Sequence, residues 1–253
     1  MPLTRRQFAA VTAAAAGVTV LPFAGRAAGD AFGATGGDVI VHPIAHASFV
    51  METPVGVIYS DPVGEAAQYA DLPAPDLILI THEHGDHFNA ETLTALTGDD
   101  TRLITNPAVH GMLPEALKAR AKAIANGEEA DFNDLSIRAI PAHNTTPERL
   151  KFHPEGRDNG YVLGFDGLTV YISGDTEDIP EMRALEGIDL AFVCMNLPFT
   201  MDVKAAASAV AEFKPTYVYP YHYRGRDGGT QDPTEFADLV GDAAEVKMGN
   251  WYG

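Results

Sequence analysis

The chain has 253 residues, enough for one large layered domain or two small ones, and hydrophobic residues make up 46% of it. Its formal net charge of −18 disfavours binding to nucleic acid or to anionic lipid surfaces, because both require clustered positive charge. The one cysteine, Cys194, cannot form a disulfide within the chain, and its apolar neighbours favour an inert thiol.

The first residues have the pattern of an export signal. Arg5 and Arg6 precede an alanine- and valine-rich run from Ala9 to about Val20, and small residues follow it. The run is shorter than the roughly 20 residues that a membrane-spanning helix needs, so we expect a secretory signal over residues 1–27. The paired arginines resemble a twin-arginine signal, which predicts export to the periplasm. An uncleaved signal would instead anchor the protein to the membrane.

From residue 38 onward, short strands and helices alternate without a linker, so residues 38–253 are expected to form one domain. Strands are expected at residues 39–41, 48–51, 56–59, 77–80, 102–105, 136–140, 161–165, 168–172, 189–194 and 216–219. Helices are expected at residues 89–96, from 107 onward, and at 113–121, 203–212 and 233–240. This interleaving predicts two packed sheets with helices on the outside.

A dense cluster of possible metal ligands follows the predicted strand at residues 77–80. His82 and His84 point to the same side of an extended segment, because the side-chain period is two. Asp86 and His87 come after Gly85, which we expect to let the backbone turn and aim them at a second point. Imidazole and carboxylate donors suit zinc or a neighbouring divalent ion. Two metals held side by side is the simplest arrangement that uses all four side chains.

Three more side chains of the same kinds lie just beyond apolar strands. His143, Asp175 and His222 each follow such a run. Residues at the ends of neighbouring strands converge in space, while the sheet keeps them rigid. We therefore expect these three side chains to join the cluster that follows residue 80.

The motif and these positions resemble the metallo-β-lactamase-fold hydrolases. The resemblance implies an α+β four-layer αββα sandwich and two divalent metal ions, with zinc favoured over manganese or iron. It implies seven metal ligands in two sets. His82, His84 and His143 would bind one metal, and Asp86, His87 and His222 would bind the other. Asp175 would bridge the two metals. Open coordination positions would remain for water and substrate, as in catalytic sites.

Other residues acquire expected roles from the same resemblance. Asp61 ends an early strand, and we expect it to orient a ligating imidazole by accepting its other N–H. The segment around His46 and the one from Asn196 to Met201 look like the ascorbate-phosphate-lactonase-like branch of the fold. His46 is expected either to contact a ligand or substrate at the site or to be an ordinary core histidine. His84 argues against the iron-binding, oxygen-reducing relatives, which carry a carboxylate there.

The polar segment at residues 144–159 admits two interpretations. It contains Arg149, Lys151 and Arg157 in an otherwise acidic chain. It is either an ordinary surface loop or a lid that presents cations to an anionic substrate group. His153, in the same segment, has no comparable claim to a metal, and neither do His42 and His110.

A two-metal centre predicts hydrolysis of a small-molecule substrate. Bound metal lowers the pKa of water to roughly 7 and polarises the bond to be cleaved. Asp86 or Asp175 is expected to orient the nucleophile or to transfer a proton. We expect a metal-dependent hydrolase, with a lactone or other cyclic ester ahead of a phosphodiester as substrate. The alternatives are a β-lactam hydrolase and a non-catalytic module that binds a ligand through its metal.

Overall fold

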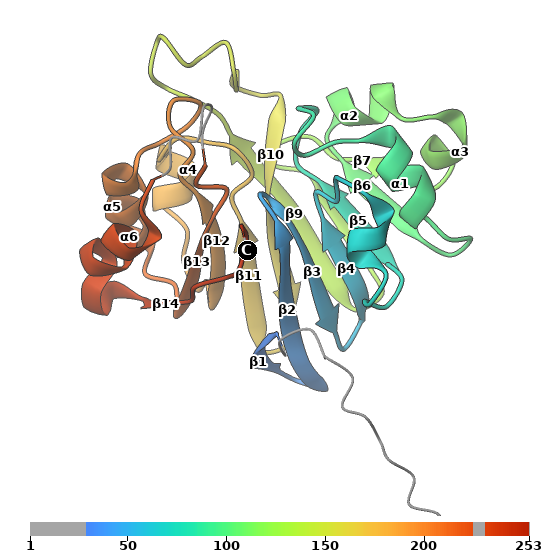
Figure 1. The fold of residues 1–253 in the computed structure, drawn as a ribbon, viewed down its shortest axis with the longest axis horizontal. Helices are drawn as coiled ribbons and strands as arrows, with labels where there is room; N and C mark the ends of the chain where they lie inside the picture. The colour runs from blue at the N-terminus through green and yellow to red at the C-terminus, as the bar shows by residue number, and fades with distance from the viewer. Residues whose placement is uncertain (1–28, 225–230, 253) are drawn as a thin grey trace, which may run out of the picture.

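The computed structural model describes residues 29–224 and 231–252, which form two packed β-sheets with helices on their outer faces (Figure 1). The predicted export signal over residues 1–27 lies outside the described residues. Within the described part of the chain, no helix is both long enough and apolar enough to cross a membrane.

The first sheet has seven strands in chain order. They are β1 (Asp30–Ala34), β2 (Gly37–Ala45), β3 (Ser48–Thr53), β4 (Gly56–Ser60), β5 (Leu77–Ile80), β6 (Arg102–Thr105) and β7 (Ala121–Ala123). Neighbours from β1 to β4 pair antiparallel, and those from β4 to β7 pair parallel. The parallel pairing brings the carboxyl ends of β4 and β5 to one edge of the sheet. All four residues of β5 are buried, as expected of a strand covered on both faces.

The second sheet also has seven strands, in the order β14-β13-β12-β11-β10-β9-β8. They are β8 (Glu129–Phe132), β9 (Leu135–Ala142), β10 (Asp158–Phe165), β11 (Leu168–Ile172), β12 (Leu190–Cys194), β13 (Tyr217–Tyr221) and β14 (Glu245–Val246). Strands β8 to β11 pair antiparallel and β11 to β14 pair parallel. The carboxyl ends of β11, β12 and β13 therefore share one edge, as those of β4 and β5 do in the first sheet.

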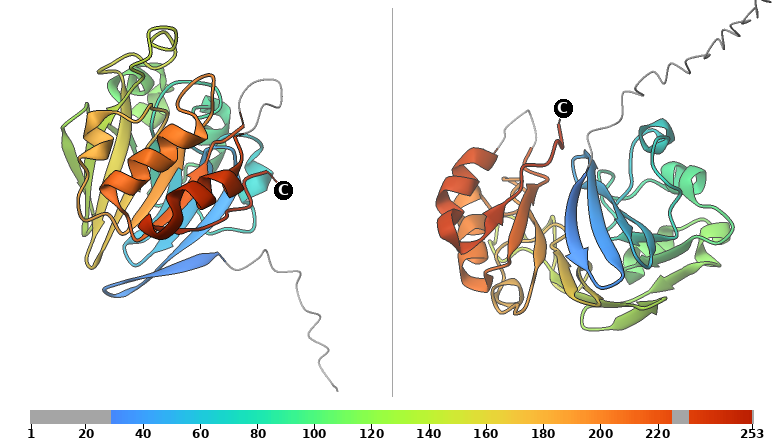
Figure 2. Two further views of the ribbon diagram at one scale, coloured as in Figure 1. Left: turned by 90° about the vertical axis from the view of Figure 1, so that its left-hand side faces the viewer. Right: turned by 90° about the horizontal axis from the view of Figure 1, so that it is seen from below.

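Helices cover the outer face of each sheet (Figure 2). On the first sheet lie the 3-10 turn η1 (Ala66–Tyr69) and helices α1 (Ala90–Leu96), α2 (Pro107–Met112) and α3 (Glu115–Lys118). On the second lie α4 (Pro180–Arg183), α5 (Val203–Phe213), α6 (Pro233–Val240) and the 3-10 turn η3 (Gly241–Ala243). The layers thus follow the predicted αββα order. The Asn106 side chain accepts a hydrogen bond from the Val109 N–H, so it caps α2 ahead of Pro107.

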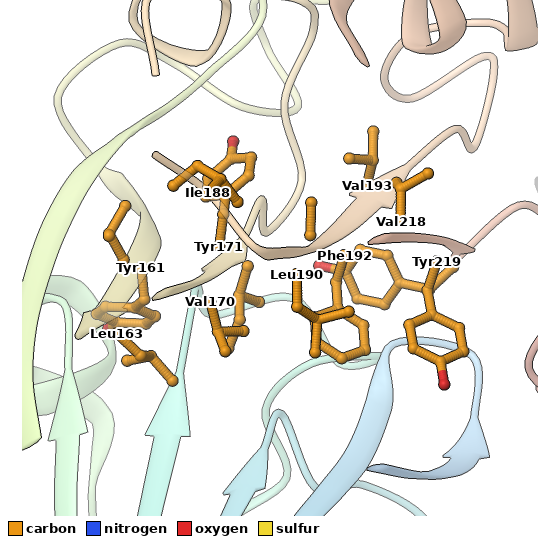
Figure 3. Close-up of a cluster of buried hydrophobic side chains, with 14 of the residues drawn as sticks. Tyr161, Leu163, Val170, Tyr171, Ile188, Leu190, Phe192, Val193, Val218 and Tyr219 are labelled. Carbon is orange, nitrogen blue, oxygen red and sulfur yellow. The ribbon is translucent and has the colours of Figure 1, made fainter. Parts of the chain in front are cut away.

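Apolar side chains of the second sheet alternate between its two faces (Figure 3). Leu190 and Phe192 point toward the first sheet, whereas Tyr171 and Val193 point toward the covering helices. Between the sheets, the ring of Phe192 stacks on that of Phe49, with centroids 4.0 Å apart. This aromatic packing joins the two sheets below the edge where the candidate site lies.

The structure departs from the predicted elements at the edges of the sheets. The predicted helix at residues 113–121 is wrong, because α3 covers four residues and the chain then continues into β7. Strands β1, β7, β8 and β14 were not predicted, because they are short and half-exposed and carry little apolar pattern. Strand β1 pairs with β2, so ordered structure begins before residue 38.

Candidate metal centre

The histidine cluster lies in the tight turn that follows β5. The His87 N–H donates to the carbonyl oxygen of His84 at 2.9 Å, and Nε2 of His82 lies 3.1 Å from Nδ1 of His84. Gly85 is not needed for this turn, contrary to expectation: its φ is not positive, and an added Cβ would meet open space. The turn therefore depends on backbone hydrogen bonds rather than on glycine.

Side chains from both sheets form three groups of possible metal ligands. Within each group, one potential ligand atom per residue lies within 4.8 Å of the others. The groups are His82, His84 and His153; His46, Asp86 and His222; and His82, His87 and Asp175. Of the seven ligands implied by the resemblance, the structure thus brings together all except His143.

Asp175 lies between these groups. Its Oδ1 is 3.4 Å from Nε2 of His87, and its Oδ2 is 3.3 Å from Nε2 of His153 and 3.4 Å from Nε2 of His222. The buried His87 Nε2, His153 Nε2 and Asp175 Oδ1 atoms have no hydrogen-bond partner, which is costly unless a cation occupies the space between them. The donor set therefore fits a divalent metal ion, with Asp175 in reach of several of the imidazoles.

Burial favours the metal-binding form of two of the histidines. Burial lowers the pKa of both His82 and His84, which favours the neutral imidazole that binds a metal. Burial alone would raise the pKa of Asp175, but the neighbouring His222 and His87 hold it well below its usual range. Asp175 is therefore a carboxylate at neutral pH.

His153 takes the position that was expected for His143. Nε2 of His153 faces Asp175, and its ring centroid lies 4.8 Å from that of His84. His143 is buried, and its backbone N–H donates to Oγ1 of Thr176, but its side chain belongs to none of the three groups. This corrects the expectation that His153 has no claim to a metal.

The path of the loop explains this exchange. His153 precedes β10 instead of following a strand, so it was not among the side chains expected just beyond strand ends. The Asn144 N–H donates to the carbonyl oxygen of His153 at 2.8 Å, which closes the loop and returns its end to the site. Nδ1 of His153 pairs with Oδ2 of Asp158 at 3.0 Å, so that Nε2 turns inward. Burial lowers the His153 pKa, but Asp158 and Asp175 outweigh it and raise the pKa to about 8.

Asp61 has the geometry expected of a residue that orients a ligand. Its Oδ2 accepts a hydrogen bond from Nδ1 of His87 at 2.8 Å, and its Oδ1 accepts one from the Thr81 N–H at 2.8 Å. Both Asp61 and His87 are fully buried. The proton on Nδ1 leaves Nε2 of His87 free to face Asp175.

His46 lies at the opening of the site and is not a core histidine. Its side chain is 27% exposed, and its Nε2 is 3.2 Å from Oδ2 of Asp86. The Asp86 side chain is 47% exposed. Burial would raise the pKa of Asp86, but hydrogen bonds with His222 and His46 hold it well below its usual range.

Two of the three cations in the 144–159 loop pair with carboxylates of the protein. The Arg149 guanidinium donates to Oε1 of Glu177 at 2.6 Å. That of Arg157 pairs with Asp158 at 2.6 Å and with Glu83 at 2.9 Å. Lys151 is exposed, with its Nζ 4.9 Å from the Phe152 ring. Both arginines are thus paired with carboxylates of the protein, which favours the interpretation of an ordinary surface loop.

A cavity of about 210 Å³ opens onto the centre. It is lined by His84, Asp86, Phe152, His153, Asp175, Asn196 and Phe199. Nδ2 of Asn196 lies 3.2 Å from Asp175 and 3.1 Å from Nε2 of His222. Asn196 follows β12 as Asp175 follows β11, so its position in the chain could have indicated it. A larger cavity, of about 600 Å³, lies along β6, β7 and β8 and contains none of the histidines.

Comparisons with known proteins agree with this geometry. The model of a beta-lactamase superfamily domain matches residues 41–222, from β2 to the last candidate ligand. The UPF0173 metal-dependent hydrolase of Pyrococcus furiosus is 31% identical over 214 residues, covering 80% of this chain and 92% of the relative. That of Thermococcus onnurineus is 36% identical over 187 residues, covering 72% and 81%.

Solved structures show the same architecture. A crystal structure from Parabacteroides distasonis, provisionally described as a metal-dependent hydrolase, has a TM-score of 0.79 at 42% identity, covering 87% of this chain and 97% of the other. Two more distant structures match in fold alone. Igni18, a metallo hydrolase from Ignicoccus hospitalis, has a TM-score of 0.69 at 23% identity and covers 83% and 94%. The metallo-beta-lactamase fold protein YhfI from Bacillus subtilis has a TM-score of 0.63 at 15% identity and covers 82% and 90%.

Proposed function

This chain belongs to the beta-lactamase superfamily and is a metal-dependent hydrolase with the metallo-β-lactamase fold, and from that premise we propose that it cleaves a small lactone or related ester with a pair of divalent cations. The observation that carries the proposal is the position of Asp175, whose Oδ1 faces His87 and whose Oδ2 faces His153 and His222. Zinc suits these donors, and manganese and iron share them.

The residues of the chain divide between two cation positions. One position would be held by His82, His84 and His153 and the other by Asp86 and His222, with Asp175 shared. His87, which the family resemblance assigns to the second position, lies 3.4 Å from Asp175. When bound, the cations lower the pKa of a coordinated water and polarise the carbonyl group to be attacked. The protein itself supplies ligand orientation, through Asp61 and Asp158, and the cavity that admits the substrate.

Three polar side chains of the cavity are placed for the chemical step. The carboxylates of Asp86 and Asp175 remain ionised at neutral pH, so either can accept a hydrogen bond from the attacking water and orient it. The Asn196 amide lines the same opening, and the N–H that now faces Nε2 of His222 could donate to the oxygen on which negative charge develops once a cation binds that nitrogen. Their close grouping favours catalysis over simple ligand binding.

The lining of the cavity favours a small, uncharged ring as substrate. None of its described residues is a lysine or an arginine, and the rings of Phe152 and Phe199 meet edge to face with centroids 5.1 Å apart. Aromatic walls stabilise apolar groups, whereas a phosphodiester would gain nothing from them. We therefore place lactones and other cyclic esters ahead of phosphodiesters.

A substrate panel tests the proposal. The purified protein, loaded with zinc or manganese, is assayed on lactones, phosphodiesters and β-lactams, with and without a chelator. We expect chelator-sensitive hydrolysis of lactones above that of the other two classes. Preferred hydrolysis of phosphodiesters or β-lactams would overturn the substrate assignment. Full metal occupancy with no activity on any class would favour the non-catalytic binding module.

We also infer that residues 1–27 direct export to the periplasm through the twin-arginine route. The support is the sequence pattern alone, with Arg5 and Arg6 ahead of a short apolar run. The double substitution Arg5→Lys, Arg6→Lys should retain the protein in the cytoplasm, as measured by fractionation of the expressing cells. Equal periplasmic amounts of variant and wild type would contradict this inference.

A further inference from the structure

His46 is held at the rim of the metal centre by an unusual backbone conformation. It lies in the tight turn between β2 and β3 with a φ of 57°, a left-handed value that costs free energy for a residue other than glycine. Its N–H donates to the carbonyl of Trp251 at 3.3 Å, and its carbonyl accepts from the His222 N–H at 3.1 Å. The turn is thus tied both to the C-terminal segment and to the candidate ligand after β13.

The side chain of His46 converges with two candidate ligands. Its Nε2 lies 3.2 Å from Oδ2 of Asp86, and Nε2 of His222 lies 3.5 Å from the same oxygen. The rings of His46 and His222 are 3.9 Å apart between centroids. Two imidazole nitrogens and a carboxylate oxygen therefore surround one point, which is a donor set for a divalent cation.

The other ring nitrogen of His46 has a partner that fixes its direction. Nδ1 lies 2.9 Å from the hydroxyl of Tyr252, and the backbone N–H of Arg224 donates to that hydroxyl at 3.4 Å. When Nδ1–H donates to Tyr252, the lone pair of Nε2 points toward Asp86. The arrangement repeats that of His87, whose Nδ1 is held by Asp61 while its Nε2 faces the site.

We propose that His46 is a direct ligand of the second cation position, together with Asp86 and His222, and that Tyr252 orients it. The inference rests on the proposed two-cation function. It gives the second position five protein donors, more than the four of a tetrahedral zinc site, when His87 and the shared Asp175 are included. It also makes the C-terminal segment part of the centre.

Cadmium titration of the full chain tests the proposal, with a chelator as competitor. We compare the wild type with His46→Gln, Tyr252→Phe and the control His42→Gln; His42 lies in β2 and pairs with Glu52 outside the centre. We expect two cadmium ions in the wild type and in the control. Tyr252→Phe should lower the affinity for the second ion by about 10- to 100-fold. His46→Gln should lower the affinity for the second ion by more than about 100-fold and leave the affinity for the first ion unchanged.

Cadmium NMR with nitrogen-labelled histidine gives a readout that needs neither activity nor a variant. If His46 is a ligand, its Nε2 should show a direct coupling to cadmium in the wild-type protein. Two bound ions without this coupling would overturn the ligand assignment and leave the proposed function standing, even if His46→Gln weakens binding. A wild type that binds fewer than two ions would instead contradict the two-cation function.

Discussion

Nδ1 of His87 lies 2.8 Å from Oδ2 of Asp61, and both side chains are fully buried. The same carboxylate accepts hydrogen bonds from the N–H and hydroxyl of Thr81, so it cannot rotate away. Asp61 thus determines which nitrogen of His87 is presented to a cation.

We expect Asp61→Asn to weaken metal binding without removing a ligand. The amide retains the volume of the carboxylate but loses its charge, and removal of such a partner costs about 10- to 100-fold in metal affinity. The measurement is a metal titration against a chelator, with the exposed Asp38→Asn as the matched control. Equal affinity in wild type and Asp61→Asn would show that the contact does not orient His87.

The exchange of His143 for His153 predicts different metal contents. His153→Ala removes an imidazole that faces Asp175, so the purified variant should contain about one metal ion fewer per chain than the wild type. His143→Ala should retain the wild-type content, because its side chain belongs to none of the ligand groups. Elemental analysis of both variants decides the assignment. Metal loss in His143→Ala alone would restore the arrangement that the family resemblance implies.

Local sequence pattern was sufficient for the histidine turn but not for the complete site. The positions from His82 to His87 follow directly from an apolar run, and Asp175 and His222 follow strands in the same way. His153 reaches the site only because a loop closes through the backbone contact between Asn144 and His153. A contact of that kind is absent from any residue spacing, so the sequence could not reveal it.

The loop cations show the same limit of local pattern. The sequence shows that Arg149 and Arg157 are basic, but not that Glu177 and Glu83, from other segments, neutralise them. The edge strands were missed for a different reason: β7 and β14 have two or three residues and no buried apolar stripe. The central strands β5, β6, β11 and β12, being apolar and buried, were predicted close to their observed bounds.

Phe199→Ala should change substrate binding without changing metal binding. The ring lines the cavity beside Phe152, so its loss removes apolar contact worth about 2 kcal/mol, or roughly 30-fold in KM for a ring-shaped ester. The exposed Leu150→Ala, in the neighbouring loop, is the control. Steady-state kinetics with a lactone and an acyclic ester give the two KM values. An unchanged KM for both would place the substrate elsewhere.

Arg149→Met should destabilise the fold rather than alter the preference for charged substrates. Glu177, whose side chain is 4% exposed, would lose the charged hydrogen bond from Arg149 at a cost of about 2 kcal/mol. Lys151→Met, at an exposed cation of the same loop, should change stability by less than about 0.5 kcal/mol. Urea unfolding measures both. If Arg149→Met raised KM for anionic substrates only and kept the wild-type stability, the interpretation of the loop as a lid would be favoured instead.

The lowered pKa of Glu177 predicts that the protein loses stability in acid. Burial would raise its pKa, but hydrogen bonds from Thr145 and Thr146 lower it from 4.5 to about 2. As the pH falls, the Glu177 carboxyl therefore binds a proton in the unfolded chain before it does so in the folded protein. Its contribution to stability is complete above pH 4.5 and is lost as the pH falls toward 2. In urea unfolding at stepped pH, Glu177→Gln should flatten the loss of stability below pH 4.5, whereas the exposed control Glu186→Gln should follow the wild type. Parallel curves for Glu177→Gln and wild type would contradict the lowered pKa.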